Sequence, residues 1–179
     1  MPHFVVLLRG VNVGKAKRVP MAVFKQLLQA QGFTAVHTLL NSGNAVGVHS
    51  SRLATALAKK LHDALQAELG LDVPVVVKTA AEFKAAVAES PLAALPEAEH
   101  ARVLVAFAQD SVALQPLQAV APLVQPAERL HIGSHAAYLH CANGILQSQA
   151  ALALLGKMGR GLTTRNWATV LKIQAVWGA

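Results

Sequence analysis

Short apolar runs alternate with longer amphipathic stretches in the first half of the chain. The apolar runs are bounded by glycine, proline or asparagine, which is typical of β-strands. Between them, leucine and other large apolar residues recur at intervals of three or four, which is typical of helices with one buried face. The predicted strands are 3–9, 35–40, 44–49 and 73–78. One predicted helix starts at Pro20 and is stopped by Gly32, and the other is capped by Ser50 or Ser51 and is followed by Gly70. The resulting β-α-β-β-α-β order is that of a ferredoxin-like split β-α-β unit.

The second half predicts a smaller subdomain of the same general class. Thr79 is placed to cap a short helix, and a polar linker framed by Pro91 and Pro96 follows it. Beyond the linker we expect a strand, a weak helix, a hairpin turning at Gly133-Ser134, a helix and a terminal helix. Their predicted ranges are 102–108, 111–121, 128–141, 147–155 and 164 onward. We therefore predict an α+β protein, with a ferredoxin-like subdomain at 1–98 and an α+β subdomain at 99–179.

The charge is distributed unevenly along the chain. Sixteen basic and nine acidic side chains give a net charge of +7, and eight of the basic residues precede the first acidic residue, Asp63. A basic surface favours phosphates, nucleic acid or acidic small molecules as partners. The apolar fraction of 54% argues against disorder.

Several classes of protein are disfavoured by the composition. Cys141 is the only cysteine, so no disulfide can form within the chain, and no apolar run is long enough to cross a membrane. With no signal-peptide pattern at the start, we expect a cytoplasmic protein without membrane contact. Neither paired carboxylates nor a zinc-ligand spacing stands out, so the sequence names no catalytic group, no metal and no cofactor.

A glycine-rich loop follows the first predicted strand. Residues 10–16 read G-x-x-x-G-K-A, one residue shorter than a Walker loop, and Ala16 lacks the hydroxyl that binds magnesium, which excludes a nucleoside triphosphatase of that type. A loop of this kind before a helix start can still hold an anion on its backbone N–H groups. Basic side chains in and beside the loop add positive charge, and these are Arg9, Lys15, Lys17 and Arg18.

Two further stretches carry polar side chains that backbone geometry explains only in part. Asn41-Ser42-Gly43-Asn44 is a turn signal after the second predicted strand. Because the first two strands of such a unit run parallel, their terminal loops should meet at one edge of the sheet. Near the C-terminus, Thr163 or Thr164 is placed to cap the terminal helix, which would put Arg165 in its first turn, against the helix dipole.

Five motifs together resemble the bacterial family known as domain of unknown function 1697. They read LLRGVNVG, KRVPM, LLNSGN, VPVVVKT and TTRNWATVLK, in order along nearly the whole chain. The resemblance implies an α+β protein with a ferredoxin-like N-terminal part and a second α+β subdomain, and it implies no particular activity. The chain departs from the family pattern at Gly47, where an aromatic is usual, and at 147–150, where two basic residues are missing.

We predict that a small phosphate- or carboxylate-bearing ligand binds at a basic, asparagine-rich site between the two subdomains. The predicted ligand-binding residues are Arg9, Asn12, Lys17, Asn41, Ser42, Asn44, Thr164, Arg165 and Asn166. If Arg165 is exposed at this site, its replacement by alanine should cost little stability. Two alternatives stay open: a nucleic-acid-binding ferredoxin-like module, and a structural or protein-interaction role without catalysis. Whether the protein is an enzyme, and its oligomeric state, also stay open.

Overall fold

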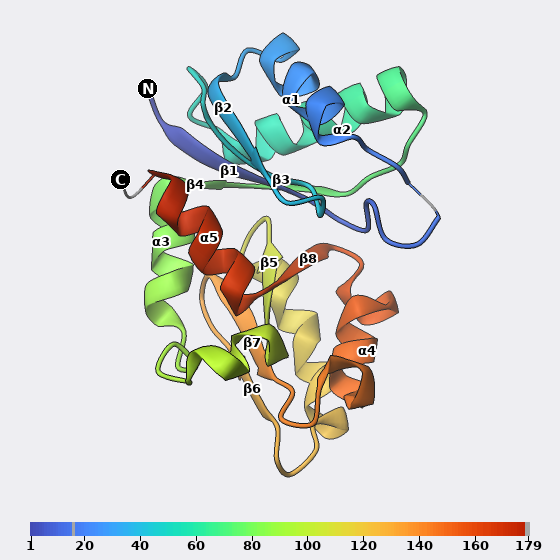
Figure 1. Ribbon diagram of the computed structural model, residues 1–179, viewed down its shortest axis with the longest axis vertical. Coiled ribbons are helices and arrows are strands. Elements are labelled where there is room, and N and C mark those ends of the chain that lie inside the picture. Colours follow the sequence, from blue (N-terminus) through green and yellow to red (C-terminus); the bar gives the residue numbers. More distant parts are fainter. Residues whose placement is uncertain (16, 178–179) are drawn as a thin grey trace. The chain divides into compact units, whose positions relative to one another are not determined.

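Two four-stranded antiparallel sheets organise the computed structural model, which describes residues 1–15 and 17–177 (Figure 1). The chain divides into two compact units, Met1–Phe83 with the C-terminal residues from Ile173, and Lys84–Lys172. The α+β class is confirmed. We predicted a subdomain boundary at residue 98, whereas the first compact unit ends at Phe83. A subdomain boundary at residue 98 stays a prediction.

The first unit has the predicted β-α-β-β-α-β order. Its elements are β1 (His3–Leu8), α1 (Met21–Ala30), β2 (Thr34–Leu39), β3 (Asn44–Val48), α2 (Ala54–Leu69) and β4 (Val75–Thr79). The sheet order is β2-β3-β1-β4, and each neighbouring pair is antiparallel. This is the arrangement of a split β-α-β unit, because β3 separates the parallel strands β1 and β2.

The core of the first unit lies between the sheet and its two helices. Alternate side chains of β1, namely Phe4, Val6 and Leu8, face this core, as the strand period of two requires. Phe24 of α1 and Leu61 of α2 are completely buried in the same cluster. Each such burial stabilises the fold by about 1.5–3 kcal/mol relative to an exposed side chain.

The turn between β2 and β3 requires glycine at position 43. Gly43 has a φ of +78°, and a Cβ there would lie 2.6 Å from Cβ of Leu8 and 2.8 Å from Cγ2 of Val11. Both the left-handed backbone and the close approach of the first strand exclude a larger residue. The NSGN turn is therefore packed against the end of β1.

The second unit repeats the strand order of the first. It contains part of α3 (Ala80–Glu89), then η1 (Glu97–Arg102), β5 (Val103–Ala108), η2 (Val112–Leu123), β6 (Arg129–Ile132), β7 (Ala136–His140), η3 (Ile145–Gln147), α4 (Gln149–Leu155), η4 (Lys157–Gly159), β8 (Leu162–Asn166) and the start of α5 (Trp167–Trp177). The sheet order is β6-β7-β5-β8, so β5 to β8 take the places of β1 to β4. In place of a regular first helix, this unit has the 3-10 segment η2, which contains Pro116 and Pro122.

The predicted start of the terminal helix is wrong. Thr164, Arg165 and Asn166 belong to strand β8, where Arg165 pairs with Val105 of β5. The helix begins at Trp167, and Oδ1 of Asn166 accepts a hydrogen bond from the N–H of Thr169 at 2.9 Å. Asn166 therefore supplies the cap that we expected from a threonine, because pairing with β5 outweighs the local capping signal.

No helix in the described part of the chain is long and apolar enough to cross a membrane.

Candidate functional site

The loops after β1 and β2 meet, as predicted, and Asn12 joins them. Its Nδ2 donates hydrogen bonds to the backbone oxygens of Val19 (2.8 Å) and Asn41 (2.6 Å), and its Oδ1 accepts one from the N–H of Val19 (2.9 Å). The N–H of Leu8 also donates to the oxygen of Gly43 at 2.8 Å. Both amide hydrogens of Asn12 are used within the protein, so Asn12 shapes the site and offers no N–H to a ligand.

Asn44 and Ser42 have a similar role in the second loop. Asn44 is completely buried, and its Nδ2 donates to the backbone oxygen of Leu39 (3.0 Å) and to Oγ of Ser42 (2.8 Å). These bonds close the β2–β3 turn from inside. The structure thus gives both residues a structural function, and their predicted contact with a ligand stays a prediction.

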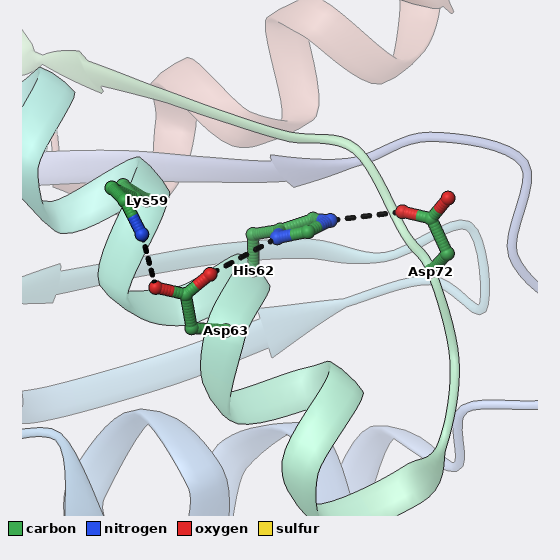
Figure 2. A network of polar contacts seen from close by, with 4 residues as sticks. All are labelled: Lys59, His62, Asp63 and Asp72. Carbon is green, nitrogen blue, oxygen red and sulfur yellow. Dashed lines mark hydrogen bonds and ion pairs between the residues drawn. The ribbon is translucent and has the colours of Figure 1, made fainter.

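Lys17 holds the first loop against the segment that leads into β4. Its Nζ donates to the backbone oxygen of Asp72 at 2.7 Å, and the Asp72 carboxylate lies 2.9 Å from Nε2 of His62. Figure 2 shows this histidine between two carboxylates, with Asp63 at 3.4 Å from Nδ1 and Lys59 at 2.5 Å from Asp63. The hydrogen bond with Asp72 raises the pKa of His62, and the same bond lowers the pKa of Asp72. The two carboxylates near Lys17 therefore face basic groups, Lys59 and His62, whereas the ammonium of Lys17 itself bonds a backbone oxygen.

A surface depression of about 270 Å³ lies where the two loops reach the start of α1. The residues that line it are Asn12, Arg18, Val19, Pro20, Met21 and Asn41. Two of the predicted ligand-binding residues, Asn12 and Asn41, are among them. Arg18 was noted for its charge but was not among the predicted ligand-binding residues, although its position two residues before Pro20 marks it as a neighbour of the helix start.

The start of α1 leaves backbone N–H groups available at this depression. Pro20 precedes the helix, no side chain caps it, and the first turn contains no acidic residue. The N–H of Phe24 makes the first bond of the helix, to the oxygen of Pro20. The N–H groups of Met21, Ala22 and Val23 therefore have no partner within the helix, and they lie at its positive end.

Arg9 is close in sequence to Asn12, which lines the depression, but Arg9 itself is not among the lining residues. Its N–H donates to the oxygen of Pro74 at 3.0 Å, and partial burial lowers the pKa of its guanidinium. Its predicted role in holding an anion stays a prediction.

Arg165 is buried, which contradicts the assumption that it is exposed. Only 7% of the residue is accessible, and its Nη1 donates to Oγ1 of Thr163 and to the backbone oxygen of Thr164, both at 2.7 Å. Burial lowers the pKa of Arg165 to about 10. The proposal that Thr164, Arg165 and Asn166 share a ligand site with the loops of the first unit stays a prediction.

The burial of Arg165 reverses the expected effect of its removal on stability. We expect Arg165→Ala to lower the free energy of unfolding by about 2–3 kcal/mol, because it removes two hydrogen bonds and the packing of a long side chain. Urea unfolding followed by circular dichroism measures this loss, and Arg160→Ala, at an exposed position nearby, is the control. A loss below about 0.5 kcal/mol, as is usual for a surface substitution, would contradict the expectation.

One family match and one solved structure identify the family and the fold. The family described as "Protein of unknown function (DUF1697)" matches residues 1–138. The conserved bacterial protein SP0830 from Streptococcus pneumoniae is 23% identical, with a TM-score of 0.76 over 97% of both chains, which shows a shared fold. Protein BT0572 from Bacteroides thetaiotaomicron covers 95% of both chains at 9% identity, with a TM-score of only 0.23. No curated protein matches the chain. Since the family match covers more than half of the sequence, the chain belongs to the DUF1697 family.

Proposed function

We propose that this protein binds a small anionic ligand, bearing a phosphate or a carboxylate, at the depression where α1 begins. The observation that supports the proposal is the uncapped start of a ten-residue helix, with no acid in its first turn, beside a depression that Pro20, Met21 and the exposed Arg18 line. Helix starts of this kind bind anions through backbone N–H groups and the helix dipole.

Each part of the site has a separate task in this proposal. The N–H groups of Met21, Ala22 and Val23 donate to the anion, and the guanidinium of Arg18 pairs with it. Asn12 holds the loop closed, and through its bond to Asn41 it keeps the two loops together. Lys17 fixes the far side of the first loop through Asp72. The proposal concerns binding, and it includes no chemical step.

Removing the charge of Arg18 is the sharpest test of this site. We expect Arg18→Gln to weaken binding of inorganic phosphate or a nucleotide about tenfold, the size of one lost charge-assisted hydrogen bond. Lys25→Gln is the matched control, because Lys25 is an exposed cation on α1 that does not line the depression. Isothermal titration of both variants against each anion measures the difference.

Thermal shift provides the complementary measurement. A ligand at tenfold excess over its dissociation constant should stabilise the wild-type protein by about 1.4 kcal/mol. The proposal fails if no phosphate, carboxylate or nucleotide at millimolar concentration raises the melting temperature, or if both variants bind equally well.

The same protein samples can distinguish small-anion binding from the nucleic-acid-binding alternative. Binding to mixed-sequence RNA that falls steeply with salt would favour that alternative, since phosphate-backbone contacts release counterions. A small anion held at one helix start should instead show a shallow dependence on salt.

A further inference from the structure

Strand β6 is a free edge of the second sheet. In the order β6-β7-β5-β8 it stands at one end, and among the described strands it pairs only with β7. The hairpin fixes which backbone groups of β6 are used: the N–H of Gly133 donates to the oxygen of Ala136 at 2.9 Å. In an antiparallel pair, hydrogen-bonded and non-bonded residue pairs alternate along the strand.

Because of this alternation, two residues of β6 direct their backbone N–H and C=O groups away from β7. Counting back from the bonded pair Gly133–Ala136, Ile132 and Leu130 occupy non-bonded pairs, opposite Ala137 and Leu139. Their N–H and C=O groups therefore point away from β7, toward the free edge. These are the groups that an added strand would bond.

A groove runs along this edge, on the face of the sheet that η2 covers. It has a volume of about 320 Å³ and is lined by Gln118, Ala121 and Val124 on one side and by Leu130, His131 and Ile132 on the other. The side chains of Leu130 and Ile132 pack against the core of the second unit, beneath η2. A strand added to β6 would direct every second side chain to this same face, and so into the groove.

The charge of the edge indicates which strand it suits. Arg129 and His131 are exposed, and their side chains lie on the opposite face of β6 from Leu130 and Ile132. No acidic residue occurs between Arg129 and the C-terminus. Two carboxylates from other elements lie near this face, but each already has partners: Glu89 accepts the N–H groups of the β6–β7 turn, and Glu99 pairs with Arg102 and His140. Among the described residues Arg129 makes no ion pair, so an acidic side chain on the added strand would meet a cation there.

We propose that β6 and the groove beside it bind an extended peptide of another protein by strand addition. The peptide has apolar side chains at alternate positions, which enter the groove, and acidic side chains between them, which face Arg129. Backbone hydrogen bonds to Leu130 and Ile132 supply affinity, and the groove supplies selectivity. This site is distinct from the start of α1 and does not depend on the function proposed above.

A pair of substitutions on η2 tests the groove. The probe is a fluorescein-labelled hexapeptide with blocked termini that alternates valine with glutamate, followed by fluorescence anisotropy. We expect Ala121→Glu to weaken its binding at least about tenfold, because a longer, charged side chain then occupies the groove in place of an apolar side chain of the peptide. Ala119→Glu is the matched control: Ala119 is also an exposed alanine of η2 but does not line the groove, so binding should change less than about twofold.

A substitution on β6 tests the backbone contact separately. Ile132→Pro removes an N–H that points away from β7, so it should abolish binding and preserve the sheet, whereas Ile132→Val should retain binding. Circular dichroism checks that each variant is folded, and if Ile132→Pro is not, the two variants on η2 still decide. The proposal is overturned if the wild-type protein shows no saturable binding up to millimolar peptide, or if Ala121→Glu binds as the wild type does. It is also overturned if sedimentation shows a wild-type dimer that Ile132→Pro dissociates, since a second copy of the chain would then occupy the edge.

Discussion

Replacement of Trp167 by alanine should lower the free energy of unfolding by about 3–5 kcal/mol, the range for a large aromatic side chain removed from a core. Trp167 is the first residue of α5 and is 2% exposed. Val170, one helical turn later, is completely buried, so this side of the helix start contributes to a packed interior. The cap at Asn166 fixes where the helix begins, which restricts how far the chain can move to fill the space.

Urea unfolding of Trp167→Ala beside two other variants measures this effect. Trp167→Phe keeps most of the apolar surface and should cost less than the alanine variant. Lys172→Ala, at an exposed position of the same helix, should change stability by no more than about 0.5 kcal/mol. A loss below about 1 kcal/mol for Trp167→Ala would show that the surroundings collapse onto the site, and would contradict the expectation of a rigid core.

The second large effect concerns Glu89, which stabilises the β6–β7 turn. Its carboxylate accepts hydrogen bonds from the backbone N–H groups of Ser134 (2.9 Å), His135 (3.0 Å) and Ala136 (3.3 Å). The hydroxyl of Tyr138 lies 3.1 Å from it and shares its single hydrogen with the backbone oxygen of Ala86. A carboxylate at the last residue of a helix is opposed by the dipole of that helix. Here the three backbone N–H groups and the nearby Tyr138 hydroxyl offset this cost, and they tie α3 to the hairpin.

We expect Glu89→Ala to cost about 3 kcal/mol, since hydrogen bonds to a charged group contribute more than neutral ones and the turn loses its acceptor. Glu97→Ala, at an exposed position on η1, is the control and should be nearly neutral. The two variants can be compared by urea unfolding at pH 7. If the two variants were equally stable, water would be replacing the Glu89 carboxylate at little cost in the free energy of unfolding.

The contribution of Glu89 should also depend on pH in a defined direction. Burial raises the pKa of this carboxyl, but the three backbone N–H groups and the Tyr138 hydroxyl outweigh it and hold the pKa below the ordinary value of 4.5. A lowered pKa in the folded state means that the stabilisation is complete above the ordinary value and is lost as the pH falls through the folded one. The stability difference between wild type and Glu89→Gln should therefore shrink below pH 4.5. A difference that stays constant down to pH 3 would contradict the ionised carboxylate as its source.

A neighbouring glycine shows why this contact needs a particular backbone. A Cβ at Gly133 would overlap with Oε1 of Glu89, so only glycine lets the carboxylate reach the turn. The sequence marks Gly133-Ser134 as a turn, and the hairpin is confirmed. The carboxylate that binds the turn comes from a residue 45 positions before Ser134, and no local pattern indicates that pairing.

The elements of the first unit could be predicted because their signals are local. Strand and helix periods are properties of neighbouring residues, and Gly43 and Pro20 mark boundaries by their own backbone restrictions. The meeting of the two loops followed from the same order of elements, since a split β-α-β unit brings the ends of β1 and β2 to one edge. Asn12 and Asn41 were identified on that basis, and they do line the depression at α1.

What the tertiary structure decided depends on residues far apart in the chain. The segment at Thr164 has a local pattern for a helix cap, yet it forms a strand because β5, about sixty residues earlier, offers an edge to pair with. That pairing carries Arg165 into a buried position, which its charge alone argues against. Likewise, Arg18 became a candidate for ligand binding only when folding set it beside an uncapped helix start. Local periodicity is a property of neighbouring residues, whereas burial and the meeting of separate loops arise only when distant segments pair.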